Sequence, residues 1–171
     1  MKSRTIEKTW KQFHDLLAIH TTGALEKLAP PATDALLDGA ERALGVKLPT
    51  DLRALYRLAN GFAPDAFLIR DDYRLLSVDE MVRESRDLVG APVIMDLLAG
   101  EVEIAKKVVR LVIAIAKPDD PDVERISVRL RKKGATIEIW YREGGIHDFE
   151  EVVDTSETLE EWLEACLEYY G

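Results

Sequence analysis

The chain has few of the features that mark secreted or membrane-bound proteins. Its 171 residues include a single cysteine, Cys166, so a disulfide framework within the chain is impossible and a reducing compartment is expected. The N-terminal residues contain no apolar segment of signal-peptide length. The longest apolar run, residues 108–116, is interrupted by Arg110 and is shorter than the ~18 residues that span a membrane. These absences predict a cytoplasmic protein that does not bind membranes.

Residues that commonly catalyse reactions or bind metals are also scarce. The histidines are His14, His20 and His147, and none lies at a short metal-ligand spacing from another histidine or from the cysteine. Neither a phosphate-binding loop nor a G-x-S-x-G motif occurs. Three aspartates within residues 118–122 resemble part of a calcium loop, but its glycine and closing glutamate are missing, so we expect a solvated turn. The sequence predicts no cofactor, no metal and no enzymatic activity, although distant residues could still form a Ser-His-Asp triad.

The net charge of −9 is concentrated at one end of the chain. Nine of the 32 acidic residues follow Ile146, where neither lysine nor arginine occurs, so the remaining 23 acidic residues are balanced by 23 basic ones. This excess argues against nucleic-acid binding by the C-terminal segment. It favours a basic protein partner, or it serves solubility alone.

Residues 36–61 have the pattern of two helices joined by a tight corner. The apolar stripe of the first helix is Leu36, Leu37, Ala40 and Leu44, and that of the second is Leu52, Leu55, Tyr56 and Ala59. Gly45 is expected to end the first helix in a left-handed conformation, and Pro49 to begin the second. Asn60 and Gly61 are expected to stop it. Glu41 could be an active acid, but we expect it to brace backbone amides at the corner.

Several residues of this corner stand out together: Glu41, Leu44-Gly45, Leu48-Pro49, Leu52, Leu55-Tyr56 and Asn60-Gly61. They resemble the signature of the SMI1/KNR4 family in the SUKH superfamily. A weaker resemblance continues through residues 75–81 and 149–167. The resemblance implies an immunity protein, because most members of the superfamily neutralise a bacterial toxin, while some eukaryotic members regulate cell-wall assembly. It implies no catalytic residue, since the signature residues position two helices.

The remaining segments predict further helices and a sheet. Ile6, Trp10, Phe13 and Leu17 indicate an N-terminal helix over residues 5–19. Residues 66–69 and 73–76 suggest a hairpin, and Ser77 with Glu80 forms a capping box that should begin a helix. Residues 92–107 have a helical composition but contain Gly100, and their structure is left open.

The second half of the chain has strand periodicity. Residues 108–117 have the pattern of a central strand, and residues 123–132 and 136–142 alternate as in a hairpin. The apolar face of a closing helix is formed by Leu159, Trp162, Leu163, Cys166, Leu167 and Tyr170. We therefore predict a single α+β domain over residues 1–171, with N-terminal helices packed on a mainly antiparallel sheet and a C-terminal closing helix.

Two groups of residues are candidates for binding a partner protein. The first lies on the outer face of the predicted hairpin and has the side-chain types that anchor interfaces: Arg125, Arg129, Arg131, Trp140 and Arg142. An equally open alternative is that a helix covers Trp140. The second is a stripe on the closing helix, formed by Glu157, Glu160, Glu161, Glu164 and Glu168. A plain solvated face is the alternative for this stripe.

These observations favour an immunity protein that binds a bacterial toxin and occludes its active cleft. A rigid interface of about 1,600 Å² would suffice, and the acidic segment would accelerate docking onto a basic toxin such as a nuclease. The second hypothesis is a non-enzymatic regulatory or scaffolding module that binds another cellular protein. Neither hypothesis involves a nucleic acid or a cofactor, and the oligomeric state is left open.

Overall fold

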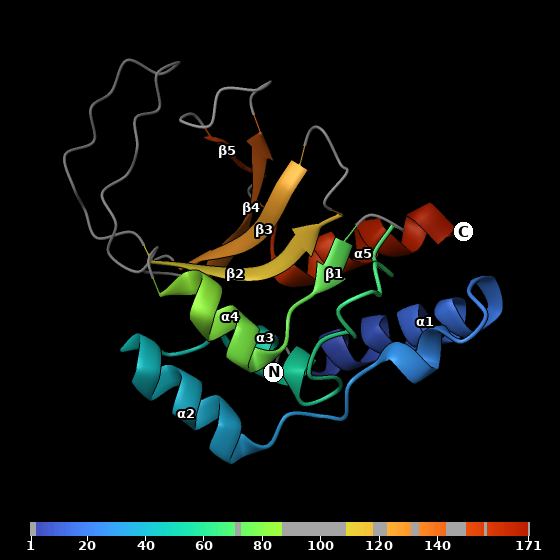
Figure 1. Cartoon of the computed structure of the whole chain (residues 1–171), viewed down its shortest axis with the longest axis horizontal. Coiled ribbons are helices and arrows are strands. Elements are labelled where there is room, and N and C mark those ends of the chain that lie inside the picture. Colours follow the sequence, from blue (N-terminus) through green and yellow to red (C-terminus); the bar gives the residue numbers. More distant parts are fainter. Residues whose placement is uncertain are drawn as a thin grey trace.

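The computed structural model describes residues 3–70, 73–86, 109–117, 123–130, 134–142, 150–155 and 157–170. The helices are α1 (Ser3–His20), the short 3₁₀ helix η1 (Ala24–Lys27), α2 (Asp34–Leu44), α3 (Thr50–Tyr56), α4 (Val78–Ser85) and α5 (Leu159–Tyr170). The strands are β1 (Tyr73–Leu75), β2 (Val109–Ala116), β3 (Val123–Leu130), β4 (Ala135–Arg142) and β5 (Glu150–Asp154). The predicted α+β class with a closing helix is confirmed (Figure 1). The predictions for residues 92–107 and 118–122 lie outside the described residues.

The five strands form one sheet in the order β1-β2-β3-β4-β5, and each strand is antiparallel to its neighbour. The predicted hairpin of β3 and β4 is confirmed, with Val128 opposite Ile137. Val128 also lies opposite Leu111 of β2, the other neighbour of β3 in the sheet. Leu111, Val128 and Ile137 therefore point to the same face of the sheet. All three are buried, which places the core on this face.

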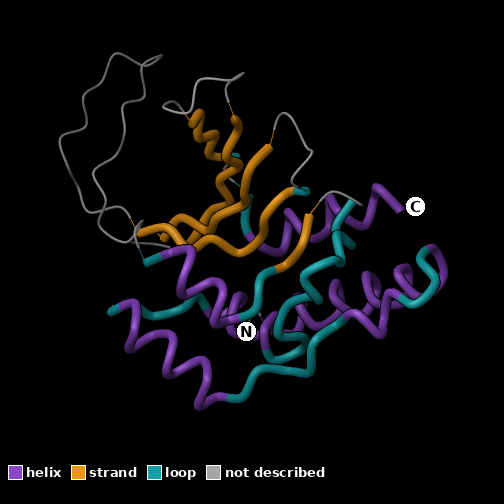
Figure 2. The backbone as a smooth tube through the Cα atoms, viewed as in Figure 1, coloured by secondary structure: helices purple, strands orange, loops and turns teal. Residues whose placement is uncertain are grey.

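Helices cover that face in two tiers (Figures 1 and 2). The helices α4 and α5 contact the sheet directly, through β2 and β4. The helices α1 and α3 pack on α5, and α2 packs on α4. The buried apolar side chains form a cluster that extends from Ile6 of α1 to Cys166 of α5. The sheet and both tiers therefore share this cluster.

The helix α1 contributes one apolar face to the core, with two aromatic and two aliphatic side chains. Ile6, Trp10, Phe13 and Leu17 are all buried, as their spacing predicts. The Phe13 and Phe62 rings stack with their centres 6.5 Å apart, and Tyr170 meets Phe13 edge-on at 6.2 Å. These contacts join α1 to the loop after α3 and to the end of α5.

The corner between α2 and α3 is built by local signals. The Thr33 side chain accepts a hydrogen bond from the Leu36 amide and begins α2, and Gly45 ends that helix with a φ of 67°. Pro49, with a φ of −53°, is the residue immediately before α3. Leu48 and Leu55 are buried where the helices meet. The helix-corner-helix prediction is confirmed.

The helix α3 is shorter than predicted, and Asn60-Gly61 does not stop it. It ends at Tyr56, after which the Leu58 and Ala59 amides still donate to the Leu55 carbonyl. The Asn60 side chain instead accepts a hydrogen bond from the Val78 amide at 2.8 Å, at the start of α4. Gly61 has a φ of 82°, and a Cβ there would lie 2.6 Å from the Ser77 amide nitrogen. The pair thus fastens the segment after α3 to the start of α4.

The hairpin predicted for residues 66–69 and 73–76 is largely wrong. One isolated bridge joins Ile69 to Tyr73, and β1 pairs with β2 instead. Arg70 bends the chain at this point with a φ of 53°, which non-glycine residues rarely adopt. Its guanidinium lies 5.8 Å from the centre of the Tyr169 ring, a cation–π contact that ties the bend to α5.

Candidate functional site

The signature acid Glu41 is engaged in the structure of the corner. It is 6% exposed, and its Oε1 accepts hydrogen bonds from the Leu48 amide at 3.1 Å and from Arg53 Nη1 at 3.0 Å. Its Oε2 accepts from Lys47 Nζ at 2.5 Å. The Lys47 bond, with the Leu48 and Arg53 bonds, lowers the pKa of Glu41 to about 2 despite burial. The expectation that Glu41 braces the corner is confirmed.

A network of charged side chains extends this brace along the outside of α2 and α3. Arg53 Nη2 donates to Asp38 at 2.9 Å and approaches Asp34 at 3.4 Å. Arg57 Nε donates to the same Asp34 oxygen at 2.9 Å, and these contacts hold the pKa of Asp34 below its usual value. The two arginines therefore link α3 and the residue that follows it to α2 through ion pairs.

The outer face of the sheet, away from the helices, contains a buried acid that the sequence analysis missed. Glu138 of β4 is 1% exposed, and its carboxylate accepts from Arg110 Nε of β2 at 2.5 Å. Arg129 of β3 lies 3.5 Å from the same carboxylate, and the Ser127 hydroxyl also reaches it at 3.5 Å. A buried carboxylate requires such partners. The sequence does show charged residues at alternate positions of these strands. It does not show which of them meet, because that depends on how the three strands are aligned.

The first group of candidate partner-binding residues, on the outer face of the β3–β4 hairpin, is described only in part. Arg125 is half-buried and lies opposite the Trp140 backbone in the β3–β4 register. Arg129 is engaged with Glu138 as described above. The side chains of Trp140 and Arg142, and all of Arg131, lie outside the described residues. Partner binding by this face stays a prediction.

The five glutamates of the stripe occupy three settings, and Glu157 lies before α5, which begins at Leu159. Glu161 belongs to a capping box at the helix start, where its Oε2 accepts from the Thr158 amide and its amide donates to the Thr158 hydroxyl. Glu157 and Glu160 are half-buried. Glu164 and Glu168 are exposed further along the helix. One member of the stripe thus has a structural task, and partner binding by the stripe stays a prediction.

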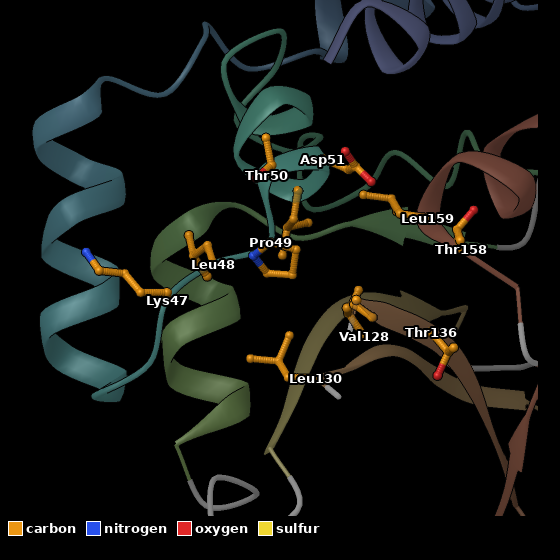
Figure 3. A pocket seen from close by; sticks show the side chains of 13 residues that line it. Lys47, Leu48, Pro49, Thr50, Asp51, Val128, Leu130, Thr136, Thr158 and Leu159 are labelled. Carbon is orange, nitrogen blue, oxygen red and sulfur yellow. The ribbon is translucent and has the colours of Figure 1, made fainter. Parts of the chain in front are cut away.

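A pocket of about 690 Å³ lies between the α2–α3 corner, the β3–β4 hairpin and the start of α5 (Figure 3). Its apolar lining comes from all three places and includes Leu48, Pro49, Leu52, Val128, Leu130 and Leu159. A volume of this size is within the range of small-molecule and side-chain binding sites. We call this pocket the corner groove. Sequence reasoning did not find it, because its walls come from segments far apart in the chain.

Asp51, in the first turn of α3, is the acidic residue of the corner groove. Its Oδ1 atom is buried, and within the described part of the chain it accepts no hydrogen bond. The carboxylate points toward the start of α5, where Thr158 and Leu159 line the groove (Figure 3). Lys47 also lines the groove, but its ammonium extends toward α2 and binds Glu41. The lining of the corner groove is therefore mixed, with apolar side chains beside Asp51, Lys47 and three threonines, Thr50, Thr136 and Thr158.

The described residues do not assemble a reaction centre of a familiar kind. Among them, no group of three or more histidine, cysteine or acidic side chains is placed to hold a metal ion. Cys166 is buried on the inner face of α5, and burial raises the pKa of its thiol to about 12, so it is a poor nucleophile. No helix in the described ranges is long and apolar enough to cross a membrane.

Comparison with known proteins agrees with the structure of the corner. No curated protein matches the chain. The model of the SMI1 / KNR4 family (SUKH-1) matches residues 31–165, which include the corner, the sheet and most of α5. Because this match covers most of its length, the chain belongs to the SMI1/KNR4 (SUKH-1) family.

Proposed function

We propose that this protein is an immunity protein that binds a basic bacterial toxin and neutralises it by covering the toxin's active cleft. The observation that carries the proposal is the state of the signature acid: Glu41 is buried and bound by Lys47, Leu48 and Arg53. Its contacts build a rigid corner rather than a reaction centre. A protein that acts by occlusion needs such a preorganised surface and no chemistry of its own.

The charge distribution supports a basic partner. The acidic excess lies entirely beyond Ile146, and Glu164 and Glu168 expose part of it on α5. Complementary charge raises the rate of diffusional encounter more than the final affinity. Nucleases are toxins whose clefts carry the required positive charge, because they bind phosphate backbones.

The test is to identify a toxic domain encoded by a neighbouring gene and to co-express it with this protein. We expect cells to survive when the protein is present and to die without it, and the purified pair to form a complex that inhibits the toxin at one-to-one stoichiometry. A destabilised variant such as Leu55→Ala, compared at equal soluble concentration, controls for expression load. Unchanged killing together with no complex would contradict the proposal. Capture of a different cellular protein would then favour the regulatory or scaffolding alternative.

A further inference from the structure

We propose that an exposed row of side chains at the ends of α1 and α5 anchors a basic partner protein. The row runs from Arg70 through Tyr169 and Tyr170 to His20, and we call it the aromatic row. Tyr169 would insert into an apolar depression that lysine or arginine side chains of the partner surround. This inference rests on the proposed function, because it gives the basic partner an anchor that the glutamate stripe alone does not supply.

Ring contacts bring three segments of the chain together in the aromatic row. The Arg70 guanidinium lies 5.8 Å from the centre of the Tyr169 ring, and the Tyr169 and Tyr170 rings meet edge-on with their centres 5.2 Å apart. The centre of the Tyr170 ring lies 6.1 Å from that of His20, the last residue of α1. Figure 1 shows the C-terminal ends of α1 and α5 on the same side of the molecule. The row is therefore continuous from the loop before β1 to the end of α1.

The aromatic row exposes side chains of the kinds that anchor interfaces. Tyr169 is 51% exposed, and Arg70 and His20 are exposed as well. Ile19, which precedes His20, is 76% exposed, so apolar surface continues beside the row. Tyrosine and arginine are among the residues that carry most of the binding energy of protein interfaces. The described surface exposes few other large apolar side chains, which makes this end of the molecule distinct.

The aromatic row is held in place before any partner binds. Arg70 has a φ of 53°, and a strained residue of this kind persists only where its surroundings hold it. The Tyr170 hydroxyl donates a hydrogen bond to the Leu68 carbonyl, two residues before Arg70, and the Tyr169 ring holds the guanidinium. A side chain that is fixed in advance loses little conformational entropy on binding, so more of its contact energy contributes to affinity.

The charge beside the aromatic row favours a basic partner. Glu164 and Glu168 are exposed in the second half of α5, a helix that contains no lysine or arginine. The undescribed residues that adjoin the row in the sequence add no base, since residues 71 and 72 are aspartates and residue 171 is a glycine. An acidic partner would therefore meet like charges around Tyr169, whereas a basic partner would form ion pairs there.

Basic side chains near the aromatic row are already engaged. The guanidinium of Arg70 faces the Tyr169 ring. The lysines that precede and follow His20 in the sequence are Lys11 and Lys27, and each is paired with an aspartate at 2.6 Å. These contacts leave the glutamates of α5 as the exposed charges that a docking surface would meet beside Tyr169.

The experiment measures the binding of three short synthetic helical peptides to the whole protein by backbone amide NMR. The first peptide has leucine on one face, bordered by lysine, which is the surface chemistry proposed for the partner. In the second the leucines are replaced by serine, and in the third the lysines are replaced by glutamate. We expect the first to shift the amides of Arg70, Tyr169 and His20 and to bind about fivefold or more tightly than the second. The third should leave these amides unchanged.

The variant Tyr169→Ala removes the anchor and keeps the acidic charges. We expect it to bring the affinities of the first and second peptides to within about twofold of each other. Leu25→Ala is the matched control, because Leu25 is another exposed apolar side chain, and it should keep the fivefold preference. Equal affinity of the first two peptides for the unmodified protein, or an undiminished preference in Tyr169→Ala, would overturn the inference.

The variant Arg70→Gly separates anchoring from folding. Glycine adopts a φ of 53° without strain, so the variant should be about as stable in urea as the unmodified protein. Loss of the guanidinium that fixes the Tyr169 ring should nevertheless weaken the first peptide by about threefold or more. An unchanged peptide affinity would mean that Arg70 and Tyr169 only fasten the end of α5, which contradicts the proposal.

The two proposals fail separately. If the toxin is neutralised and Tyr169→Ala binds it as tightly as the unmodified protein does, the aromatic row is not the anchor and the occlusion proposal stands. If the peptides behave as expected but no toxin is neutralised, the row binds a basic partner that is not a toxin. With a toxin in hand, Tyr169→Ala should raise the dissociation constant of the complex by about tenfold or more, mainly through faster dissociation, whereas Leu25→Ala should leave it unchanged.

Discussion

The carboxylate of Glu41 and the backbone amide of Leu48 are joined by a 3.1 Å hydrogen bond across the turn between α2 and α3. The bond satisfies an amide just before α3, at a place where the chain has left α2 and not yet begun the next helix. Lys47 and Arg53 bind the same carboxylate from two sides. The corner therefore depends on the ionised form of Glu41.

This dependence predicts a loss of stability in acid. The pKa of Glu41 is lowered from 4.5 to about 2 in the folded protein, chiefly by Lys47, then by Leu48 and Arg53. A lowered pKa contributes stability that is complete above about pH 4.5 and is lost as the pH falls toward 2. Glu41→Gln should cost about 1–3 kcal/mol at pH 7. Urea denaturation should show the difference between the two proteins shrinking at pH 2.5, and a difference independent of pH would contradict this account.

A second prediction compares two of the glycines with a left-handed backbone, Gly45 and Gly61. At Gly45 an added Cβ meets nothing within 4 Å, so Gly45→Ala should cost about 1–2 kcal/mol from its backbone conformation alone. At Gly61 the Cβ would also lie 2.6 Å from the Ser77 amide nitrogen, which is backbone and cannot turn aside. Gly61→Ala should therefore cost clearly more than Gly45→Ala in chemical denaturation. Equal losses would mean that the chain near Ser77 moves away freely.

Leu55 should be among the costly positions of the core. It is 0% exposed and lies in α3, which packs on α1 and α5. Leu55→Ala should lower the free energy of unfolding by about 2–5 kcal/mol, through lost apolar transfer energy and the cavity left behind. Leu25→Ala, at a position that is 37% exposed, is the matched control and should change it by less than about 0.5 kcal/mol. A loss below about 1 kcal/mol at Leu55 would contradict the packing described here.

The glutamate stripe predicts how the partner docks. Replacing Glu160, Glu164 and Glu168 by lysine should slow association and flatten its dependence on salt, since exposed charges are screened over about 8 Å at physiological ionic strength. The same three replaced by glutamine should produce about half of that change, because the charge is removed and not reversed. Binding kinetics at two salt concentrations measure both effects. An association rate that does not change with either variant would assign the stripe to solubility.

The corner could be predicted from sequence because its determinants are local. Gly45 and the Ser77–Glu80 capping box each act within a few residues of themselves, and the structure has both where expected. The partner of β1 could not be predicted, since β1 pairs with β2 far along the chain. Asp51 was missed for a similar reason. In the sequence it is an ordinary first-turn acid, and only α5 and the hairpin enclose it.

The same limit applies to the outer face of the sheet. Alternation predicts that Arg129 and Glu138 point away from the helices, but it does not predict that Glu138 lies between Arg110 and Arg129. That arrangement depends on how three strands are aligned with one another. The contact of Glu41 with the Leu48 amide, by contrast, could be predicted, because the two residues are close in the sequence and belong to the same corner.

The shortness of β1 limits how this protein can associate through its backbone. At Tyr73–Leu75 it is three residues long, bounded by the left-handed bend at Arg70 and by Ser77, which begins α4. A partner strand that extended the sheet at this edge would find too few free amides and carbonyls for a stable ladder. At this edge the protein is thereby protected from pairing with copies of itself. Recognition on this side must instead come from the side chains that the helices and loops display.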